Sequence, residues 1–587
     1  MPHRSPRNSC AAPFAFSLLL LALAAPAAAA VRVEVEGVED ELRRNVLALL
    51  SIREAGEDDL TEHRVRQLHA RAPEEIEEAL QPFGHYKPVI HAELTRQDDD
   101  WTALYRIDPG PPLRVAALDL RVTGPGADDP RFRELAAAFP LAPGEVLVHP
   151  AWERGKQTFV DYAASAGYVD AEFDPAEVRV DLERYAATAV LHFATGPRYR
   201  FGEVTFHQDV IEPELLRGYV TFERGDPLDV DKVLEMQEAL SDSPYFARVE
   251  VVTEPGRAEG LEVPVEVHLT PAKRERYMAG LGYGTDTGAR GTVNAELRRL
   301  NRQGHRGEAD FRISDIEQRG ELRYLVPGPY PRTDTMTYSA GYSELATEDQ
   351  ERRTSLVGAS RTQTRGGWRE AYSLYLQRED FVVGLDAGTA DLLVPGASWE
   401  RVDADDRIYP LHGHRLQLRL QGAHESLLSD ATFLQGEVEG KLVRGLGERL
   451  RVLVRAEVGS TWTDEFRRLP PSFRFFAGGD QSVRGYGFQD LAPLDEGGNL
   501  IGGEALLTGS VEVDSLFLDL EKLGRWGAAV FYDAGNALTD LSDPLEQGAG
   551  LGLRWLSPIG LVRADAAFAL SEPGTPVRFH FTIGPDL

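Results

Sequence analysis

The second half of the chain is dominated by short runs in which apolar and polar residues alternate. Residues 415–421 alternate strictly, and in 577–583 the apolar side chains fall on one face and the polar or charged ones on the other. A two-residue period is typical of β-strands, because successive side chains point to opposite sides. An apolar face opposite a charged face fits a strand with lipid outside and a wet lumen inside.

This alternation begins near Arg274 and predicts an all-β domain over 274–587. At about 10 residues a strand, plus turns and longer outer loops, the segment holds roughly 16 strands. We therefore expect a 16-stranded antiparallel transmembrane β-barrel. A soluble β-sandwich or propeller is the alternative, but it does not readily explain an apolar outer face on so many strands.

The first half carries a different, repeated pattern. Three β-like runs each end in a turn and lead into helical periodicity; they lie at 31–37, 114–124 and 200–206. Two further strands complete each unit, and in the clearest of them Pro264 suggests an edge strand or a bulge. A repeat of roughly 75–90 residues in β-α-α-β-β order predicts three α+β modules. These modules are expected at 31–110, 111–197 and 198–273.

The first 30 residues combine the basic Arg4 and Arg7, an apolar run and an alanine-rich end at Ala30. This order predicts a secretory signal peptide at 1–30. A membrane anchor is the alternative, but the run is short for a spanning helix, which needs about 20 residues. The single cysteine, Cys10, lies in this segment, so residues 31–587 contain no disulfide. Export without disulfides suits a bacterial cell envelope.

Charge and motifs exclude several classes of function. The formal net charge of -31 at pH 7 makes nucleic-acid binding a poor prospect. The sequence contains no nucleophile elbow, phosphate-binding loop or metal-binding histidine spacing that stands out. His412 and His414 stand at the start of a strand, where a wet face explains them better than a metal does. We therefore predict no enzyme, no cofactor and no metal site.

One connection is too long for a tight barrel. About 40 residues, at about 463–502, separate the strand that ends near Trp462 from the next clear strand, whereas most connections have about 2–6 residues. Aromatic residues and glycines are dense at its centre, which favours a packed loop over a disordered one.

The centre of this loop carries the most specific motif. Residues 478–487 include Val483, Arg484, Gly485 and Tyr486, and they resemble the lumenal-loop signature of the BamA/TamA outer-membrane assembly factor superfamily, which also includes the two-partner secretion transporters. Further similarities lie in an aromatic-x-Asp-x-Gly strand motif with Phe531 and Gly535, in the penultimate-strand region 548–561, and in modules that resemble POTRA domains. Three modules are typical of the TamA branch. The resemblance covers essentially the whole chain after the signal peptide.

The alternation also indicates which wall residues point into the lumen. Val511 and Val513 lie outward, so Glu512 points inward, and the same reasoning turns Asp533 inward. The resemblance implies that Arg484 meets acids at these two positions, and a guanidinium group binds carboxylates bidentately. Gly485 would allow a sharp turn and Tyr486 would pack on the barrel wall. The alternative is that Arg484 is an exposed loop arginine.

The resemblance implies a protein of the bacterial outer membrane, with POTRA domains in the periplasm, that helps insert or assemble β-barrel proteins such as autotransporters. The edges of the POTRA sheets would capture client strands by β-augmentation. The seam between the first and last strands would open sideways into lipid, and the glycine-rich first strand is compatible with a weak seam.

The implied partners are a TamB-like periplasm-spanning protein, unfolded outer-membrane protein clients and membrane lipid, around a monomeric barrel. A two-partner-type secretion pore is an alternative, and so is lipid traffic to the outer membrane with an inner-membrane-anchored partner. A passive porin would not explain the modules.

Overall fold

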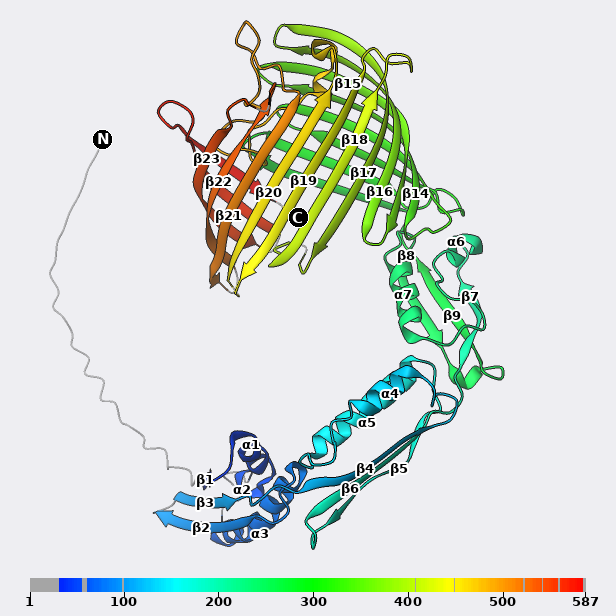
Figure 1. Cartoon of the computed structure of the whole chain (residues 1–587), viewed down its shortest axis with the longest axis vertical. Helices are drawn as coiled ribbons and strands as arrows, with labels where there is room; N and C mark the ends of the chain where they lie inside the picture. The colour runs from blue at the N-terminus through cyan, green and yellow to red at the C-terminus, as the bar shows by residue number, and fades with distance from the viewer. Residues whose placement is uncertain are drawn as a thin grey trace, which may run out of the picture. The chain divides into compact units, whose positions relative to one another are not determined.

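The structure is a computed structural model that describes residues 31–54, 61–97, 100–406, 408–447, 449–520, 523–540, 542–557 and 560–583 (Figure 1). The predicted signal peptide lies outside the described residues. The chain divides into two compact units. The first contains modules 1 and 2 up to Arg200 with two short pieces of module 3, at 227–230 and 259–262; the second contains the rest of module 3 and the β-domain.

Module 1 has a three-stranded sheet in the order β1-β3-β2, in which β1 is parallel to β3 and β2 is antiparallel to it. Thr61 starts the long helix α3 by accepting a hydrogen bond from the backbone N–H of Arg64 (3.3 Å). The central strand β3 alternates, burying residues such as Tyr105 against the helices. The elements are β1 (Val31–Glu36), α1 (Asp40–Leu49), α2 (Ser51–Glu54), α3 (Glu62–Leu80), the 3-10 turn η2 (Gln81–Phe83), β2 (Val89–Gln97) and β3 (Asp100–Asp108).

Module 2 repeats this topology with the sheet order β4-β6-β5. The side chain of Asp129 caps α4 by accepting from the backbone N–H of Arg131 (3.0 Å). Phe132 is fully buried, and its ring lies against the rings of Phe159, Tyr162, Tyr168 and Phe193. The elements are β4 (Arg114–Thr123), α4 (Pro130–Ala137), α5 (His149–Ser165), β5 (Glu172–Asp181) and β6 (Ala186–Ala194).

Module 3 has the sheet order β7-β9-β8, so all three modules share one sheet topology. Modules 2 and 3 have the predicted β-α-α-β-β order, and module 1 adds the short helix α2 between its two longer helices. The prediction of an edge strand at Pro264 is wrong, because β9 is the central strand. Its ladder with β8 ends at Val265, so the proline, which has no N–H to donate, falls just beyond that ladder. The elements are β7 (Arg200–His207), α6 (Pro213–Arg217), α7 (Val230–Ser241), β8 (Phe246–Thr253), the 3-10 turn η3 (Pro255–Arg257) and β9 (Glu262–Pro271).

The β-domain is a single 16-stranded sheet in which each strand pairs antiparallel with the next along the chain, and it curls into a nearly closed barrel (Figure 1). The predicted fold class and strand number are confirmed. The strands are β10 (Glu275–Gly284), β11 (Gly288–Leu297), β12 (Arg306–Ile313), β13 (Glu317–Pro327), β14 (Asp334–Ala346), β15 (Gln350–Arg365), β16 (Trp368–Val383), β17 (Asp386–Ala404), β18 (His412–Ala423), β19 (Phe433–Leu446), β20 (Leu450–Trp462), β21 (Ala505–Leu520), β22 (Gly524–Leu538), β23 (Glu546–Ser557), β24 (Gly560–Ala569) and β25 (Val577–Ile583).

Alternation along these strands separates an apolar exterior from a polar interior. In β22, Val530 and Tyr532 are exposed on the outside, whereas Phe531 and Asp533, which alternate with them, are buried inside. Leu281 on β10 and Phe579 on β25 are also exposed. Among the described residues, no helix is long and apolar enough to cross a membrane.

Module 3 is attached to the barrel through the turns after β11 and β13. The Tyr245 hydroxyl donates to the carbonyl of Gly304 (2.7 Å), and the backbone N–H of Glu212 donates to the carbonyl of Arg302 (2.8 Å). Arg332 donates to the carboxylate of Glu235 on α7 (2.6 Å), and this bond lowers the pKa of Glu235. Module 3 is therefore fixed beside the strands that follow β10.

We predict that Phe132→Ala lowers the free energy of unfolding of module 2 by about 3–5 kcal/mol, because it leaves a cavity among four aromatic rings. Proteolytic susceptibility across a urea series, followed in the full chain, measures this change. Leu182→Ala, at an exposed position between β5 and β6, is the matched control and should stay within about 0.5 kcal/mol of the parent. Equal effects of the two substitutions would contradict a core role for Phe132.

Candidate functional site

The long connection between β20 and β21 covers residues 463–504 and folds into the barrel. It contains two 3-10 turns, η4 (Phe466–Arg468) and η5 (Pro471–Phe473). Its first arm, which we define as residues 463–474, contacts β16 and β17. The backbone N–H of Ser472 donates to Glu379 (3.2 Å), and Arg474 donates to Asp386 (3.2 Å). The loop is thus an ordered element that contacts the barrel wall.

Arg474 also gives this arm its shape. Its side chain is buried, and besides Asp386 it donates to three carbonyls of the loop itself, those of Leu469, Ile501 and Arg467, at 2.7, 3.0 and 2.9 Å. An arginine used in this way satisfies backbone acceptors that burial removes from water.

The second arm, which we define as residues 475–491, contains the predicted motif. Val483 and Tyr486 are buried in an apolar cluster that includes Phe475 of the loop and Leu506 and Ala569 of the wall. The Tyr486 hydroxyl donates to Glu546 (3.1 Å) and to the carbonyl of Gln547 (3.3 Å), which places it on the barrel wall. The residues on both sides of the motif's arginine are therefore packed in apolar surroundings.

Arg484 binds Asp533 on β22 in a bidentate pair: Nε donates to Oδ2 (2.8 Å) and Nη2 to Oδ1 (2.9 Å). Its backbone N–H donates to the same carboxylate (3.0 Å), and Nη1 donates to Glu512 on β21 (2.7 Å). All three side chains are at most 10% exposed. Charge-assisted, two-point bonds of this kind fix both the distance and the plane of the guanidinium group.

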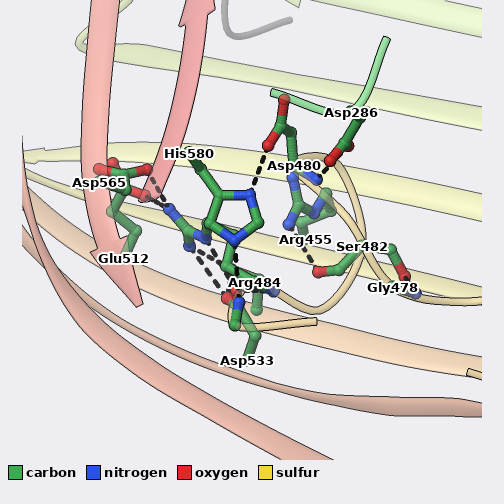
Figure 2. Close-up of polar contacts among 12 residues, drawn as sticks. Asp286, Arg455, Gly478, Asp480, Ser482, Arg484, Glu512, Asp533, Asp565 and His580 are labelled. Carbon is green, nitrogen blue, oxygen red and sulfur yellow. Dashed lines mark hydrogen bonds and ion pairs between the residues drawn. The ribbon is translucent and has the colours of Figure 1, made fainter. Parts of the chain in front are cut away.

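A third acid and a second arginine complete the cluster. Nη1 of Arg484 also donates to Asp565 on β24 (3.0 Å), and Arg554 on β23 donates to both Glu512 and Asp565. Two guanidinium groups are thus shared among three carboxylates, counting Asp533. Figure 2 shows Arg484 among these three acids. We call these five residues the lumenal clasp; it joins the loop to four consecutive strands, β21 to β24.

An aromatic ring and several glycines allow the loop to lie close to the barrel wall. The ring of Phe531 lies 3.4 Å from the Arg484 guanidinium carbon, so the aromatic residue of the strand motif stacks on the arginine. A side chain at Gly548 on β23 would start 1.9 Å from the carbonyl oxygen of Arg484. Gly485 has φ +102°, which other residues rarely adopt, and Gly535 lies tightly against β21.

The structure brings Arg484 together with both predicted acids, Glu512 and Asp533, and with Phe531 of the strand motif. Gly535 of the same motif lies on β22 against β21 and is not among the residues that contact Arg484.

Sequence reasoning missed the participation of Asp565 and Arg554, although a signal was present. Both lie at inward positions of alternating strands, and two inward groups of opposite charge on neighbouring strands are candidates for a pair. The strand pattern does not reveal which inward groups the loop arginine reaches.

A separate buried ion pair lies at the turn between β17 and β18. Arg451 binds Asp514 through two bonds of 2.8 Å and donates to the carbonyl of Pro410 (2.9 Å). Its guanidinium carbon lies 3.4 Å from the ring of Tyr409, whose hydroxyl also donates to Asp514. This pair holds Tyr409 and Pro410 against β20 and β21.

Two groups of three side chains in the described part of the chain come within reach of a single metal ion: His207–Glu266–His268 and Asp286–Asp480–His580. The first is a poor fit, because the two imidazole rings stack at 4.4 Å and Arg257 already pairs with Glu266. The lumenal clasp offers ion pairing and hydrogen bonding, because its five members are two arginines and three acidic residues rather than a nucleophile beside a base.

We predict that Arg484→Ala destabilises the folded barrel by about 3–5 kcal/mol, because Glu512, Asp533 and Asp565 stay buried with one arginine fewer. The temperature at which the folded form loses its faster gel migration should fall. Arg484→Lys should restore only part of it, since an ammonium group cannot bind two carboxylates in the same plane. Arg468→Ala, which removes an exposed arginine of the same loop, is the control and should have little effect. Normal heat stability of Arg484→Ala would contradict this role.

Three family models match parts of the chain. The Omp85 superfamily domain matches residues 300–586, a model described as POTRA domain TamA domain 1 matches 32–109, and a POTRA model described as surface antigen variable number repeat matches 199–272. A curated relative, the outer membrane protein assembly factor BamA of Nitratidesulfovibrio vulgaris, is 24% identical over 384 residues, which are 61% of this chain and 48% of the relative. The chain spans about half the length of that relative.

Solved structures are similar as well. BamA from Haemophilus ducreyi lacking POTRA domains 1–3 has a TM-score of 0.67 at 14% identity, covering 80% of this chain and 99% of that one. CdiB from Escherichia coli has a TM-score of 0.45 at 15% identity, covering 89% and 98%. The matched barrel domain, the matched POTRA modules and the BamA-like fold agree with the resemblance in the sequence: the chain belongs to the Omp85 superfamily, to which BamA and TamA belong, and is a protein of the bacterial outer membrane with its POTRA domains in the periplasm.

Proposed function

We propose that this protein helps insert or assemble β-barrel proteins, such as autotransporters, through a seam between the first and last barrel strands that opens sideways into the membrane. The observation that carries the proposal is the seam itself. Among the described residues, the sheet runs from β10 to β25 without a ladder that joins these two end strands.

Direct contact across the seam is sparse. The backbone N–H of Phe581 on β25 donates to the Oγ1 of Thr285, just after β10 (3.0 Å). β25 has seven residues, whereas its partner β24 has ten, and most side chains of β10 are exposed on both faces. Unpaired strand edges invite pairing with another strand. A client strand that meets β10 or β25 would gain main-chain hydrogen bonds that the closed seam does not make.

The periplasmic modules supply further strand edges. In each module the third strand is central, which leaves β2, β5 and β8 at one edge of their sheets. Such edges support capture of an extended segment by β-augmentation, in which main-chain hydrogen bonds give affinity without a fixed sequence. We propose that module edges hold the client and that the barrel seam receives it.

The position of the long loop argues against a secretion pore. The loop rests on β16 and β17 at one side and on β21 to β24 at the other, so it crosses the barrel interior. A client that passed through the lumen would have to displace the loop and break the buried pairs of Arg484. A lateral route leaves them intact.

We further propose that the protein acts as TamA-like proteins do: a TamB-like periplasm-spanning protein works with the modules, and the barrel is a monomer. The match of module 1 to a TamA POTRA model supports this branch over the BamA branch. Traffic of lipid to the outer membrane with such a partner is an alternative use of the same seam. Neither use requires a catalytic residue or a cofactor.

A covalent lock tests the lateral route. In a Cys10→Ser background, Thr285→Cys and Phe581→Cys joined by a short dithiol cross-linker should abolish assembly of a model autotransporter in vesicles, because the seam cannot open. Leu418→Cys with Val438→Cys, a directly paired position of β18 and β19, is the matched control and should leave assembly unchanged when cross-linked. Full assembly by the seam-locked protein would refute the lateral route. Continued passage of a secreted client through it would favour the pore.

A further inference from the structure

Beyond the lumenal clasp, the tip of the loop contacts both ends of the barrel sheet. We infer that Asp480 is a latch that holds the seam closed, by joining His580 on the last strand to Asp286 in the turn between β10 and β11. This inference rests on the proposed function for its biological meaning, but it can be tested without clients.

On the last-strand side, His580 is 3% exposed and has two partners in the loop. The backbone N–H of Gly485 donates to its Nε2 (3.0 Å), and Asp480 Oδ1 lies against its Nδ1. A nitrogen that accepts from an N–H carries no proton, so the imidazole proton is on Nδ1 and is donated to Asp480. Both bonds are made by the neutral ring in one tautomer.

On the first-strand side, the backbone N–H of Asp480 donates to Oδ2 of Asp286 (2.7 Å). The preceding residue, Gly479, has φ +102°, and a Cβ there would lie 2.5 Å from the same carboxylate oxygen. Glycine is therefore required at position 479 for the loop to approach the first hairpin this closely.

These contacts form one continuous path from β25 through the loop to the β10–β11 turn (Figure 2). Five residues further along the loop than Gly479, Arg484 fixes the same segment to β21, β22 and β24. The loop tip is thus anchored on the C-terminal strands, and its bond to Asp286 reaches across the seam. Because Gly485 and Arg484 also hold the loop on the last strands, separating β10 from β25 requires breaking the Asp480–Asp286 bond, together with the Phe581–Thr285 bond.

The same three side chains come within reach of one metal ion, but the hydrogen-bond pattern disfavours that use. A metal on Nδ1 of His580 would leave the ring proton on Nε2, where it would face the N–H of Gly485. The pattern fits a hydrogen-bonded latch, in which each link is made by a single acceptor that can be removed.

Distances between spin labels test the latch. Labels at Leu281→Cys on β10 and Phe579→Cys on β25, both exposed on the outer face, report the seam in a Cys10→Ser background of the full chain in lipid. Asp286→Ala should raise the ratio of separated to close labels about tenfold, the effect expected when one charge-assisted hydrogen bond is lost. Asp286→Asn keeps an acceptor oxygen and should restore the closed distance.

Two further variants sharpen the result. Gly479→Ala should open the seam as Asp286→Ala does, because its methyl group displaces the carboxylate. Asp315→Ala is the control: Asp315 accepts from Ala289 on β11 (3.2 Å), in the same hairpin region, and lies outside the latch. Each variant is compared only if its barrel keeps the faster gel migration of the folded form.

An unchanged distance distribution in both Asp286→Ala and Gly479→Ala would overturn the latch. So would equal opening in Asp315→Ala, since any damage to the hairpin would then suffice. The locked-seam assembly assay separates this inference from the proposed function. An open seam in Asp286→Ala with full assembly by the locked protein would refute the lateral route and leave the latch standing; the converse pair of results would refute the latch alone.

Discussion

Burial of Arg484 among carboxylates is the constraint on which the barrel interior depends. A guanidinium group placed inside a barrel loses its water, and burying an ion without partners costs several kcal/mol. Here Asp533, Glu512 and Asp565 supply the missing interactions from three different strands. Because each acid sits at a fixed register of the sheet, the loop can satisfy its arginine in only one position.

Other features follow from that position. The loop must come close to the wall, so Gly548 offers no side chain where the Arg484 carbonyl lies, and Gly485 turns the chain in a conformation that other residues resist. Val483 and Tyr486 pack in the buried apolar cluster between the loop and the barrel wall. The same placement carries Asp480 to the edge of the sheet, where the first and last strands meet with few bonds of their own. The loop is therefore held firmly to the last strands by Arg484, whereas its contact with the first hairpin is the single bond from Asp480 to Asp286.

Much of the fold could be predicted because strand alternation and helical periodicity are local. The two-residue period in 415–421 and 577–583 indicated outward and inward faces that the barrel reproduces, and the repeated β-like runs indicated three modules. The prediction of an edge strand at Pro264 was wrong because a missing N–H excludes only one hydrogen bond and does not determine where the strand lies in the sheet. The central strand β9 accommodates the proline because its ladder with β8 ends at Val265.

The sequence by itself determined the fold class, the long loop, the family resemblance and the inward direction of Glu512 and Asp533, since each depends on residues near one another in the chain. Only the tertiary structure decided that Asp565 and Arg554 join the lumenal clasp, that Arg451 pairs with Asp514, and that Asp480 reaches both His580 and Asp286. These contacts join residues up to about 200 positions apart. Alternation gives each side chain a direction, but closure of the sheet into a barrel and the path of the loop decide which of the inward groups meet.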